Sequence, residues 1–161
     1  MVIQIDTREK ARAIKKIIRY FMRNQIVYYP CSTYVGDYFS LDNARRVIDR
    51  KQNLSELYSN ICHEYDPKNP GISRFGNELE RAKMIGVKLI FLIEHGEQIK
   101  CLEDVKKWKN PQLEKTPFAW CGLKMYHEMI KLKEKYDIEY HFCEKDQTGE
   151  KIVELLQNET D

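Results

Sequence analysis

Val35-Gly36-Asp37-Tyr38 and Ile48-Asp49-Arg50-Lys51 are the two stretches of sequence that decide the predicted fold and its chemistry. Residues at i and i+2 of a strand project to the same face, so Asp49 and Lys51 are expected to point together into one site. Asp37 is expected to join them from the neighbouring strand. Carboxylates suit Mg²⁺ or Mn²⁺, and a nearby ammonium orients water or stabilises charge on a phosphate. The pattern predicts a metal-dependent site that hydrolyses phosphodiesters.

The surrounding sequence supports this short motif. An Asp-x-Lys pattern also occurs on solvated strand faces, and a short match stays a hypothesis until its structural context agrees. Here Val47 and Ile48 give the strand an apolar beginning, and Gly36 permits a close approach of the backbone. A second strand, near the N-terminus, also ends in acidic residues, at Asp6 and Glu9. The context therefore favours a site over a solvated face.

These residues resemble the XPF-type structure-specific endonuclease domain, a branch of the PD-(D/E)XK nuclease superfamily. The matching residues are Gly36-Asp37, Asp49-Arg50-Lys51, Glu56, Asp6-Thr7-Arg8-Glu9, Arg74-Phe75 with Glu78 to Arg81-Ala82-Lys83, and the apolar run Val87 to Glu94. Two departures are visible. Asp49 stands where eukaryotic members carry glutamate, and Glu56 lies one residue later than their downstream acid. The role of Glu56 is therefore left open.

The resemblance implies metal-dependent cleavage of branched, flapped or junction DNA, often by dimers. A catalytically inactive DNA-binding or scaffold module of the same fold is one alternative. A restriction-like or resolvase-like nuclease with another substrate is a second. The absence of a helicase motor or helix-hairpin-helix segment from this sequence fits a small stand-alone enzyme from a microbe or mobile element.

Further candidate catalytic residues come from the resemblance and from strand geometry. Asp6, Arg8 and Glu9 match the family's N-terminal motif, in which Asp6 or Glu9 would hold the metal or its water. Acids at such a turn can instead stabilise a helix N-terminus. Arg50 follows Asp49 and projects to the opposite face of the strand. It is therefore a candidate either for substrate contact or for a structural ion pair.

Basic residues provide the expected DNA contacts, although a formal net charge of +2 neither demands nor forbids such a partner. The candidate substrate-binding residues are Arg74, Lys106, Lys107 and Lys109. Trp108 among the lysines resembles an aromatic and basic contact surface. Lys15, Arg19 and Arg23 recur every four residues and form one helical stripe, which a solvated outer face explains equally well.

Composition indicates a globular protein. A length of 161 residues fits a single nuclease domain over residues 1–161. With 42% hydrophobic and 32% charged residues and no span of about 18 apolar residues, we expect no membrane partner and a cytoplasmic location. Five scattered cysteines favour reduced thiols, and a zinc site built with histidines is the alternative.

The periodicity of apolar residues predicts an α/β fold of the restriction-endonuclease type, a mixed central sheet with helices on both faces. Strands are expected over residues 2–6, 26–29, 34–41, 45–51, 87–93 and 138–143. Helices are expected over residues 11–24, 54–61, 74–85 and 116–136, and around 152–156. Asp42-Asn43 would form the tight turn that brings Asp37 back towards Asp49. Thr116-Pro117 would start its helix as an N-cap followed by proline at the first position.

A homodimer is expected through the face made by the last two helices. The apolar residues that motivate it are Phe118, Trp120, Leu123, Met125, Tyr126 and Met129. They exceed what one helical stripe needs, which suggests a second buried surface. Burial in the monomer's own core is the alternative. For Phe75, core packing is favoured over base stacking.

Overall fold

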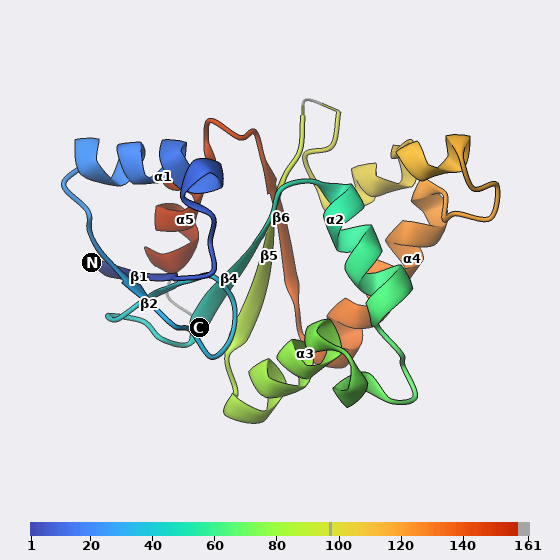
Figure 1. Cartoon of the computed structure of the whole chain (residues 1–161), viewed down its shortest axis with the longest axis horizontal. Coiled ribbons are helices and arrows are strands. Elements are labelled where there is room, and N and C mark those ends of the chain that lie inside the picture. Colours follow the sequence, from blue (N-terminus) through green and yellow to red (C-terminus); the bar gives the residue numbers. More distant parts are fainter. Residues whose placement is uncertain (97, 158–161) are drawn as a thin grey trace.

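A mixed six-stranded sheet forms the centre of the described part of the chain, with strand order β2-β1-β3-β4-β5-β6 (Figure 1). The computed structural model describes residues 1–96 and 98–157. The strands are β1 (Val2–Asp6), β2 (Val27–Cys31), β3 (Tyr38–Ser40), β4 (Arg46–Lys51), β5 (Lys88–Glu94) and β6 (Glu139–Cys143). β3 runs antiparallel to both of its neighbours, and the other pairs are parallel.

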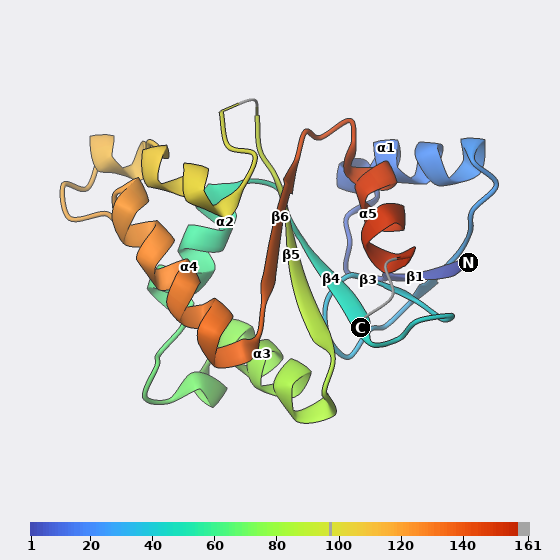
Figure 2. The same cartoon turned by 180° about the vertical axis from the view of Figure 1, so that it is seen from behind.

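Helices cover both faces of this sheet, as Figures 1 and 2 show. One face carries α1 (Ala11–Arg23) and α5 (Thr148–Gln157), and the other carries α2 (Leu54–Ser59), α3 (Arg74–Ile85) and α4 (Gly122–Tyr136). Each face has its own apolar core, because side chains alternate between the two faces of every strand. The predicted fold class, an α/β mixed sheet between helical layers, is confirmed.

Successive side chains of β4 point to opposite faces of the sheet, so the charged residues of the predicted site are divided between the two faces. Val47 packs in the core beneath α2, α3 and α4, and Ile48 packs in the core beneath α1 and α5. By the same alternation, Asp49 and Lys51 lie on the Val47 face and Arg50 on the Ile48 face. The parallel neighbour β5 is almost wholly buried, as its continuous apolar run predicts.

The strand predicted over residues 34–41 is much shorter in the structure, because only Tyr38–Ser40 is extended and paired. Gly36 has a φ of 65°, a conformation that interrupts a strand. A Cβ at this position would lie 2.4 Å from Cγ1 of Val47 and 2.9 Å from the carbonyl oxygen of Ile48. The glycine therefore lets the chain turn tightly over β4, and Asp37 leaves this turn directly above that strand.

The helix predicted from Thr116-Pro117 begins instead at Gly122. Thr116 starts a turn that is closed by a hydrogen bond from the Ala119 amide to the Thr116 carbonyl, 2.9 Å long. Proline suits the second position of such a turn as well as the first position of a helix. The Thr-Pro pair therefore could not distinguish the turn from a helix start. A Cβ on Gly122 would lie 2.5 Å from the Val105 carbonyl oxygen, so this first turn needs glycine.

Helices α4 and α5 pack on opposite faces of the sheet, so they cannot form one shared surface. The predicted location of the homodimer surface is therefore wrong. The core beneath α4 contains Met125 and Met129, whereas α5 contributes Ile152 to the core on the opposite face of the sheet. Met125 and Met129 are fully buried in the monomer, but Phe118 is 93% exposed. Among the described residues, no helix combines the length and apolar character needed to cross a membrane.

Candidate active site

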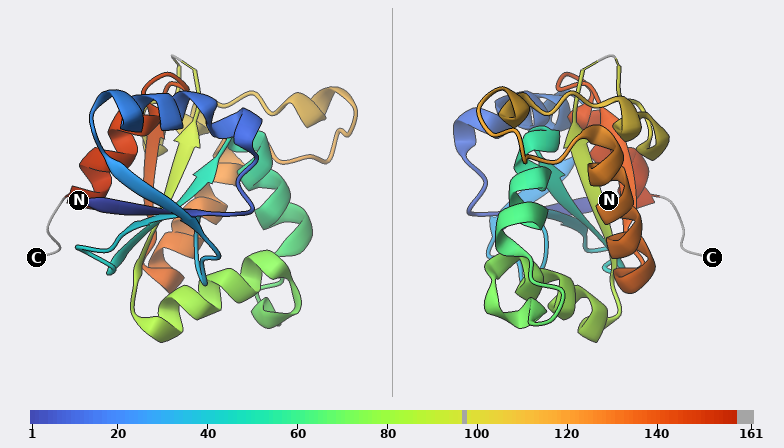
Figure 3. Two further views of the ribbon diagram at one scale, coloured as in Figure 1. Left: turned by 60° about the vertical axis from the view of Figure 1, so that its left-hand side comes forward. Right: turned by 90° about the vertical axis from the view of Figure 1, so that its right-hand side faces the viewer.

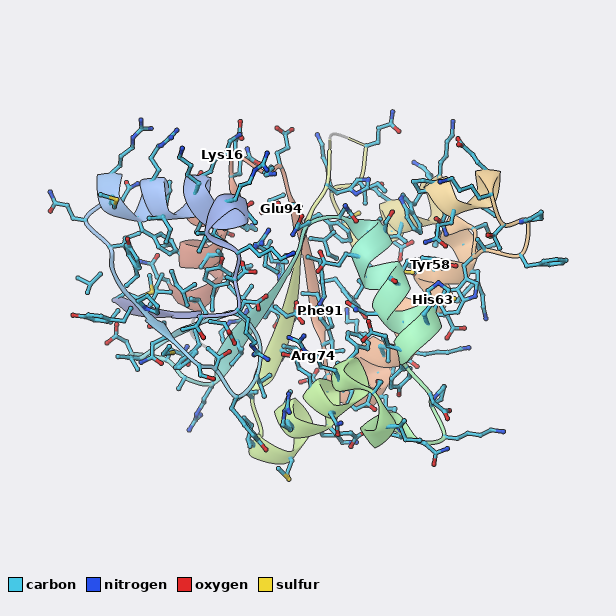
Figure 4. The ribbon with its side chains drawn as sticks, in the orientation of Figure 1. Lys16, Tyr58, His63, Arg74, Phe91 and Glu94 are labelled. Atoms are coloured by element: carbon cyan, nitrogen blue, oxygen red, sulfur yellow. The ribbon has the colours of Figure 1, made fainter. Side chains whose placement is uncertain are left out.

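A polar pocket of about 340 Å³ lies at the carboxyl end of β4, between α3 and the turn that precedes α1. Its lining residues are Arg8, Glu9, Lys10, Asp37, Asp49, Arg50, Lys51, Gln52, Glu56, Asn60, Glu64, Arg74, Phe75 and Glu78. Figure 4 labels Arg74 at the start of α3 and Phe91 on the adjacent sheet. The pocket brings together elements from widely separated parts of the chain.

Asp49 and Lys51 form a buried ion pair in this pocket. The Lys51 Nζ lies 2.8 Å from Oδ1 of Asp49, and the Lys51 side chain is only 9% exposed. It also lies 5.7 Å from the ring centre of Phe75 and 5.4 Å from that of Phe91. Ring faces attract a cation, so the aromatic pair helps hold the ammonium beside the carboxylate. Phe75 belongs to the core, as predicted, and also lines the pocket.

Asp37 is held over β4 by two hydrogen bonds. Its Oδ2 accepts from the Arg50 amide at 2.8 Å, and its own amide donates to the Ile48 carbonyl at 2.7 Å. Glu78 of α3 supports the same turn, because its Oε1 accepts from the Gly36 amide at 2.7 Å. The side chains of Asp37 and Asp49 thus reach one pocket from a turn and a strand.

Burial raises the pKa values of both pocket aspartates. Desolvation, reinforced by the charges of Asp49 and Glu9, raises the pKa of Asp37 well above its usual value. Desolvation likewise raises the pKa of Asp49 to about 7, with Lys51 acting in the opposite direction and Glu78 reinforcing the rise. Burial opposes the Lys51 charge, but the Asp49 carboxylate outweighs it, so the pKa of Lys51 is raised and the ammonium stays charged.

These shifts make the metal-free protein sensitive to pH. Since the pKa of Asp49 rises from 3.8 in the unfolded chain to about 7 in the folded protein, its stabilising contribution is complete below 3.8 and is lost as the pH rises through 7. We expect the metal-free melting temperature to fall between about pH 4 and pH 7, where the folded protein holds this proton and the unfolded chain does not, and to level off above about pH 8. Asp37→Asn should flatten this fall, because it removes one of the raised groups. Calorimetry in EDTA checks this, and equal slopes in both proteins would contradict it.

Arg50, on the Ile48 face of β4, forms ion pairs with two glutamates. Its Nε donates to Glu9 at 2.7 Å and its Nη1 donates to Glu94 at 3.2 Å. Tyr38 donates to the same Glu9 carboxylate, and Thr148 donates to Glu94 at 3.0 Å. Arg50 therefore forms the predicted structural ion pair, and because it also lines the pocket its contact with substrate stays a prediction. Through Glu9 the network fixes the turn before α1 against the sheet.

Arg50→Met should destabilise the fold strongly, because it leaves Glu9 and Glu94 buried without their cation. Removing one partner of a buried pair costs about 3–5 kcal/mol, or roughly 10 °C of melting temperature for a chain this size. The exposed neighbour Arg45 provides the matched control, and Arg45→Met should change stability by less than about 0.5 kcal/mol. Thermal melts compare the two. Adding Glu94→Gln to Arg50→Met should recover part of the loss, and no recovery would argue against a charge effect.

Asp6 lies outside the pocket-lining set and serves the turn that carries Arg8. Its carboxylate accepts from the Arg8 amide at 2.7 Å and from the Arg8 Nε at 2.9 Å, and Thr33 also donates to it. Hydrogen bonds from Arg8 and Thr33 outweigh burial and lower the pKa of Asp6 to about 2. Neither acid caps α1 through a hydrogen bond, because α1 begins after Lys10 without a side-chain cap. Arg8 itself lines the pocket.

The candidate substrate-binding residues divide into two groups. Arg74 lines the pocket, together with Glu56, whose Oε2 accepts from the Gln52 amide at 2.8 Å. The second group does not line the pocket and consists of the exposed residues Lys106, Lys107 and Lys109. Lys106 pairs with Glu103. Trp108 is only 7% exposed and packs in the core against Tyr58, at 6.1 Å between ring centres. The predicted aromatic contact surface is therefore wrong.

Glu78 is the pocket residue that sequence reasoning missed as a site residue. It lies four residues after Arg74, on the same face of α3, and both line the pocket. This i, i+4 spacing of an acid after a candidate arginine was the signal that could have identified it. Its proximity to Asp49 contributes to the raised pKa of that aspartate.

The donor set of the pocket fits a hard divalent cation. Within residues 1–96 and 98–157, no three histidine, cysteine, aspartate or glutamate side chains are grouped to hold a metal ion. Mg²⁺, however, retains several waters and typically uses one or two carboxylates. Asp37 and Asp49 provide two, and the buried Oδ1 of pocket-lining Asn60 has no hydrogen-bond partner in the described structure. The five cysteines are all free thiols.

The sequence matches no family model and no curated protein, but the fold matches solved structures. XPF from Aeropyrum pernix superposes with a TM-score of 0.63 and 16% identity, over 98% of this chain and 64% of that one. The same protein in complex with DNA gives a TM-score of 0.59 and 16% identity, over 97% and 63% of the two chains. The chain thus has an XPF-like fold, as its motifs predict, and it spans just under two thirds of the solved chains.

Proposed function

We propose that this chain is a metal-dependent DNA endonuclease that cleaves branched, flapped or junction DNA. The observation that carries the proposal is the convergence of Asp37, Asp49 and Lys51 in one pocket of an XPF-like fold. Two carboxylates can hold a hard divalent cation, and a buried ammonium beside them can stabilise charge on a phosphate, which suits metal-assisted phosphodiester hydrolysis. The resemblance of the motifs to those of structure-specific endonucleases supports the choice of substrate.

Asp37 and Asp49 would hold Mg²⁺ or Mn²⁺ through their carboxylate oxygens. A bound ion supplies positive charge that stabilises the transition state of phosphate hydrolysis. Lys51 holds its proton because Asp49 raises its pKa, so its ammonium can orient a water or stabilise charge on the scissile phosphate. Arg8 and Arg74 line the same pocket and are placed to contact neighbouring phosphates.

DNA as the partner and a homodimer as the assembly are supported by different observations. Among the similar solved structures, XPF from Aeropyrum pernix occurs in complex with DNA, which supports DNA as the partner here. A homodimer stays a prediction. The surface that we propose for it is the segment before α4 together with the first turn of that helix, where Phe118 is 93% and Leu123 is 50% exposed.

A panel of end-labelled DNAs tests the proposal. Duplex, flap, fork, four-way junction and single-stranded substrates are incubated with Mg²⁺ or Mn²⁺, and with EDTA as the control. We expect cleavage that needs the ion and favours branched substrates over plain duplex. Binding without cleavage in either ion would support the inactive scaffold instead. Equal cleavage of all duplex-containing substrates would favour a restriction-like nuclease.

A further inference from the structure

We infer that helix α1 is a binding track for a duplex arm of the DNA substrate, leading away from the active-site pocket along the outer side of the helix. The inference rests on the proposed nuclease function and adds the position of the duplex. Sequence alone left the basic stripe of this helix undecided between DNA contact and a solvated face. Its charge pairing, its groove and its position beside the pocket favour DNA contact.

The outer side of α1 has positive charge without compensation from its own helix. Its basic residues are Arg12, Lys15, Lys16, Arg19 and Arg23, and it contains no acidic residue. Ile14, Ile17 and Phe21 are buried against the sheet, so the cations face away from it, as Figure 4 shows for Lys16. Within the described chain, Lys16 pairs with Asp146, whereas the other four form no ion pair. Ordinary solvated helices balance such charges.

Helix α4 provides that contrast within the same protein. It also carries lysines, but Lys124 and Lys131 both pair with Glu128 of the same helix. Glutamates spaced three or four residues from lysines are typical of a solvated helix face. The absence of such acids from α1 leaves its cations available to an anionic partner.

A groove runs beside the second half of α1. It is lined by Lys16, Arg19, Tyr20, Arg23 and Asp146, and its volume is about 370 Å³. The three cations that line this groove provide donors for phosphate oxygens. The single acid in the groove is the partner of Lys16. A phosphate could take the place of this carboxylate, because such an exposed pair contributes little to stability.

The track is continuous with the active-site pocket. Arg8 and Lys10 line the pocket and immediately precede α1. Glu56 of α2 lines the same pocket from the other side of the sheet, and Figures 1 and 3 show α1 extending away from α2. At 1.5 Å per residue the 13 residues of α1 span about 20 Å, which corresponds to roughly 6 base pairs at 3.4 Å each. A duplex arm leaving the pocket would therefore lie along the whole helix.

Salt-dependent DNA binding tests the track. The variant combines Lys15→Gln, Arg19→Gln and Arg23→Gln, and the matched control combines Lys124→Gln, Lys131→Gln and Lys133→Gln on α4. Binding of a fork with a 12-base-pair arm is measured by fluorescence anisotropy in EDTA over a range of salt. Loss of three phosphate contacts should reduce the slope of log K against log salt by about 3, and should lower affinity on the order of 100-fold at 0.1 M salt. The control should bind as the wild type does.

A second experiment varies the length of the duplex arm of the DNA. Lengthening the duplex arm from 2 to 12 base pairs should strengthen wild-type binding, and the gain should disappear in the α1 variant. Circular dichroism establishes that both triple variants are folded, and Arg19→Gln alone, with an expected slope change of about 0.9, serves if the triple variant is not. Equal slopes for the α1 and α4 variants would overturn the inference while leaving the nuclease proposal intact. Failure of the wild type to bind or cut any DNA would instead overturn the proposed function.

Discussion

Asp37→Asn and Asp49→Asn are each expected to lower the cleavage rate by about 1,000-fold or more, which corresponds to about 4 kcal/mol of lost transition-state stabilisation. Each substitution removes a charged metal ligand and keeps nearly the same side-chain size. Asparagine at position 37 can still accept the hydrogen bond from the Arg50 amide. The loss should therefore appear in hydrolysis and not in circular dichroism spectra of the same preparations.

Asp137→Asn is the matched control for these two variants. Asp137 is exposed at the end of α4 and has a φ of 54°, a left-handed conformation that asparagine tolerates well. Within the described chain Asp137 pairs with Lys88, which lies at the start of β5, at the opposite end of the sheet from the pocket. Wild-type cleavage is expected from this control. Cleavage near the wild-type rate by both pocket variants would place the active site elsewhere.

Lys51→Ala is expected to reduce turnover far more than DNA binding. The ammonium is buried beside Asp49 and near two aromatic rings, so we expect it to act on the scissile phosphate and not on the bulk of the duplex. Removing one such group typically costs roughly 100- to 1,000-fold in turnover. Single-turnover cleavage gives the rate, and gel shifts in EDTA give the affinity.

The exposed Lys133→Ala is the control for Lys51→Ala and should change neither quantity. An equal fall of affinity and rate in Lys51→Ala would make Lys51 an ordinary phosphate contact. The unpaired Asp49 can take up a proton in this variant, since its pKa is already raised to about 7. The variant is therefore expected to remain folded, which circular dichroism checks.

Much of this fold could be predicted because local patterns coincide with tertiary burial. The apolar spacing in α1, the Gly86 that ends α3 and the continuous apolar run of β5 each gave boundaries close to those of the structure. The pairing of Asp49 with Lys51 follows from strand alternation alone. These features depend on residues that are near one another in the sequence.

The remaining features depend on long-range contacts, which local patterns do not encode. Gly36 ends its strand early because of its approach to Val47, and Gly122 sets the start of α4 through the carbonyl of Val105. The link from Arg50 to Glu94 crosses between two parallel strands. Single-sequence reasoning had no signal for these contacts.

The most direct test of the proposed centre is a titration of Mg²⁺ into a single-turnover cleavage reaction of the wild type, on the best substrate of the DNA panel. If Asp37 and Asp49 hold the ion that cleavage requires, the rate should be zero in EDTA, rise with the ion and saturate. The midpoint should move to lower ion concentration as the pH rises through about 7, where Asp49 ionises. A rate that is the same in EDTA and in saturating Mg²⁺ would contradict a metal-dependent nuclease at this site.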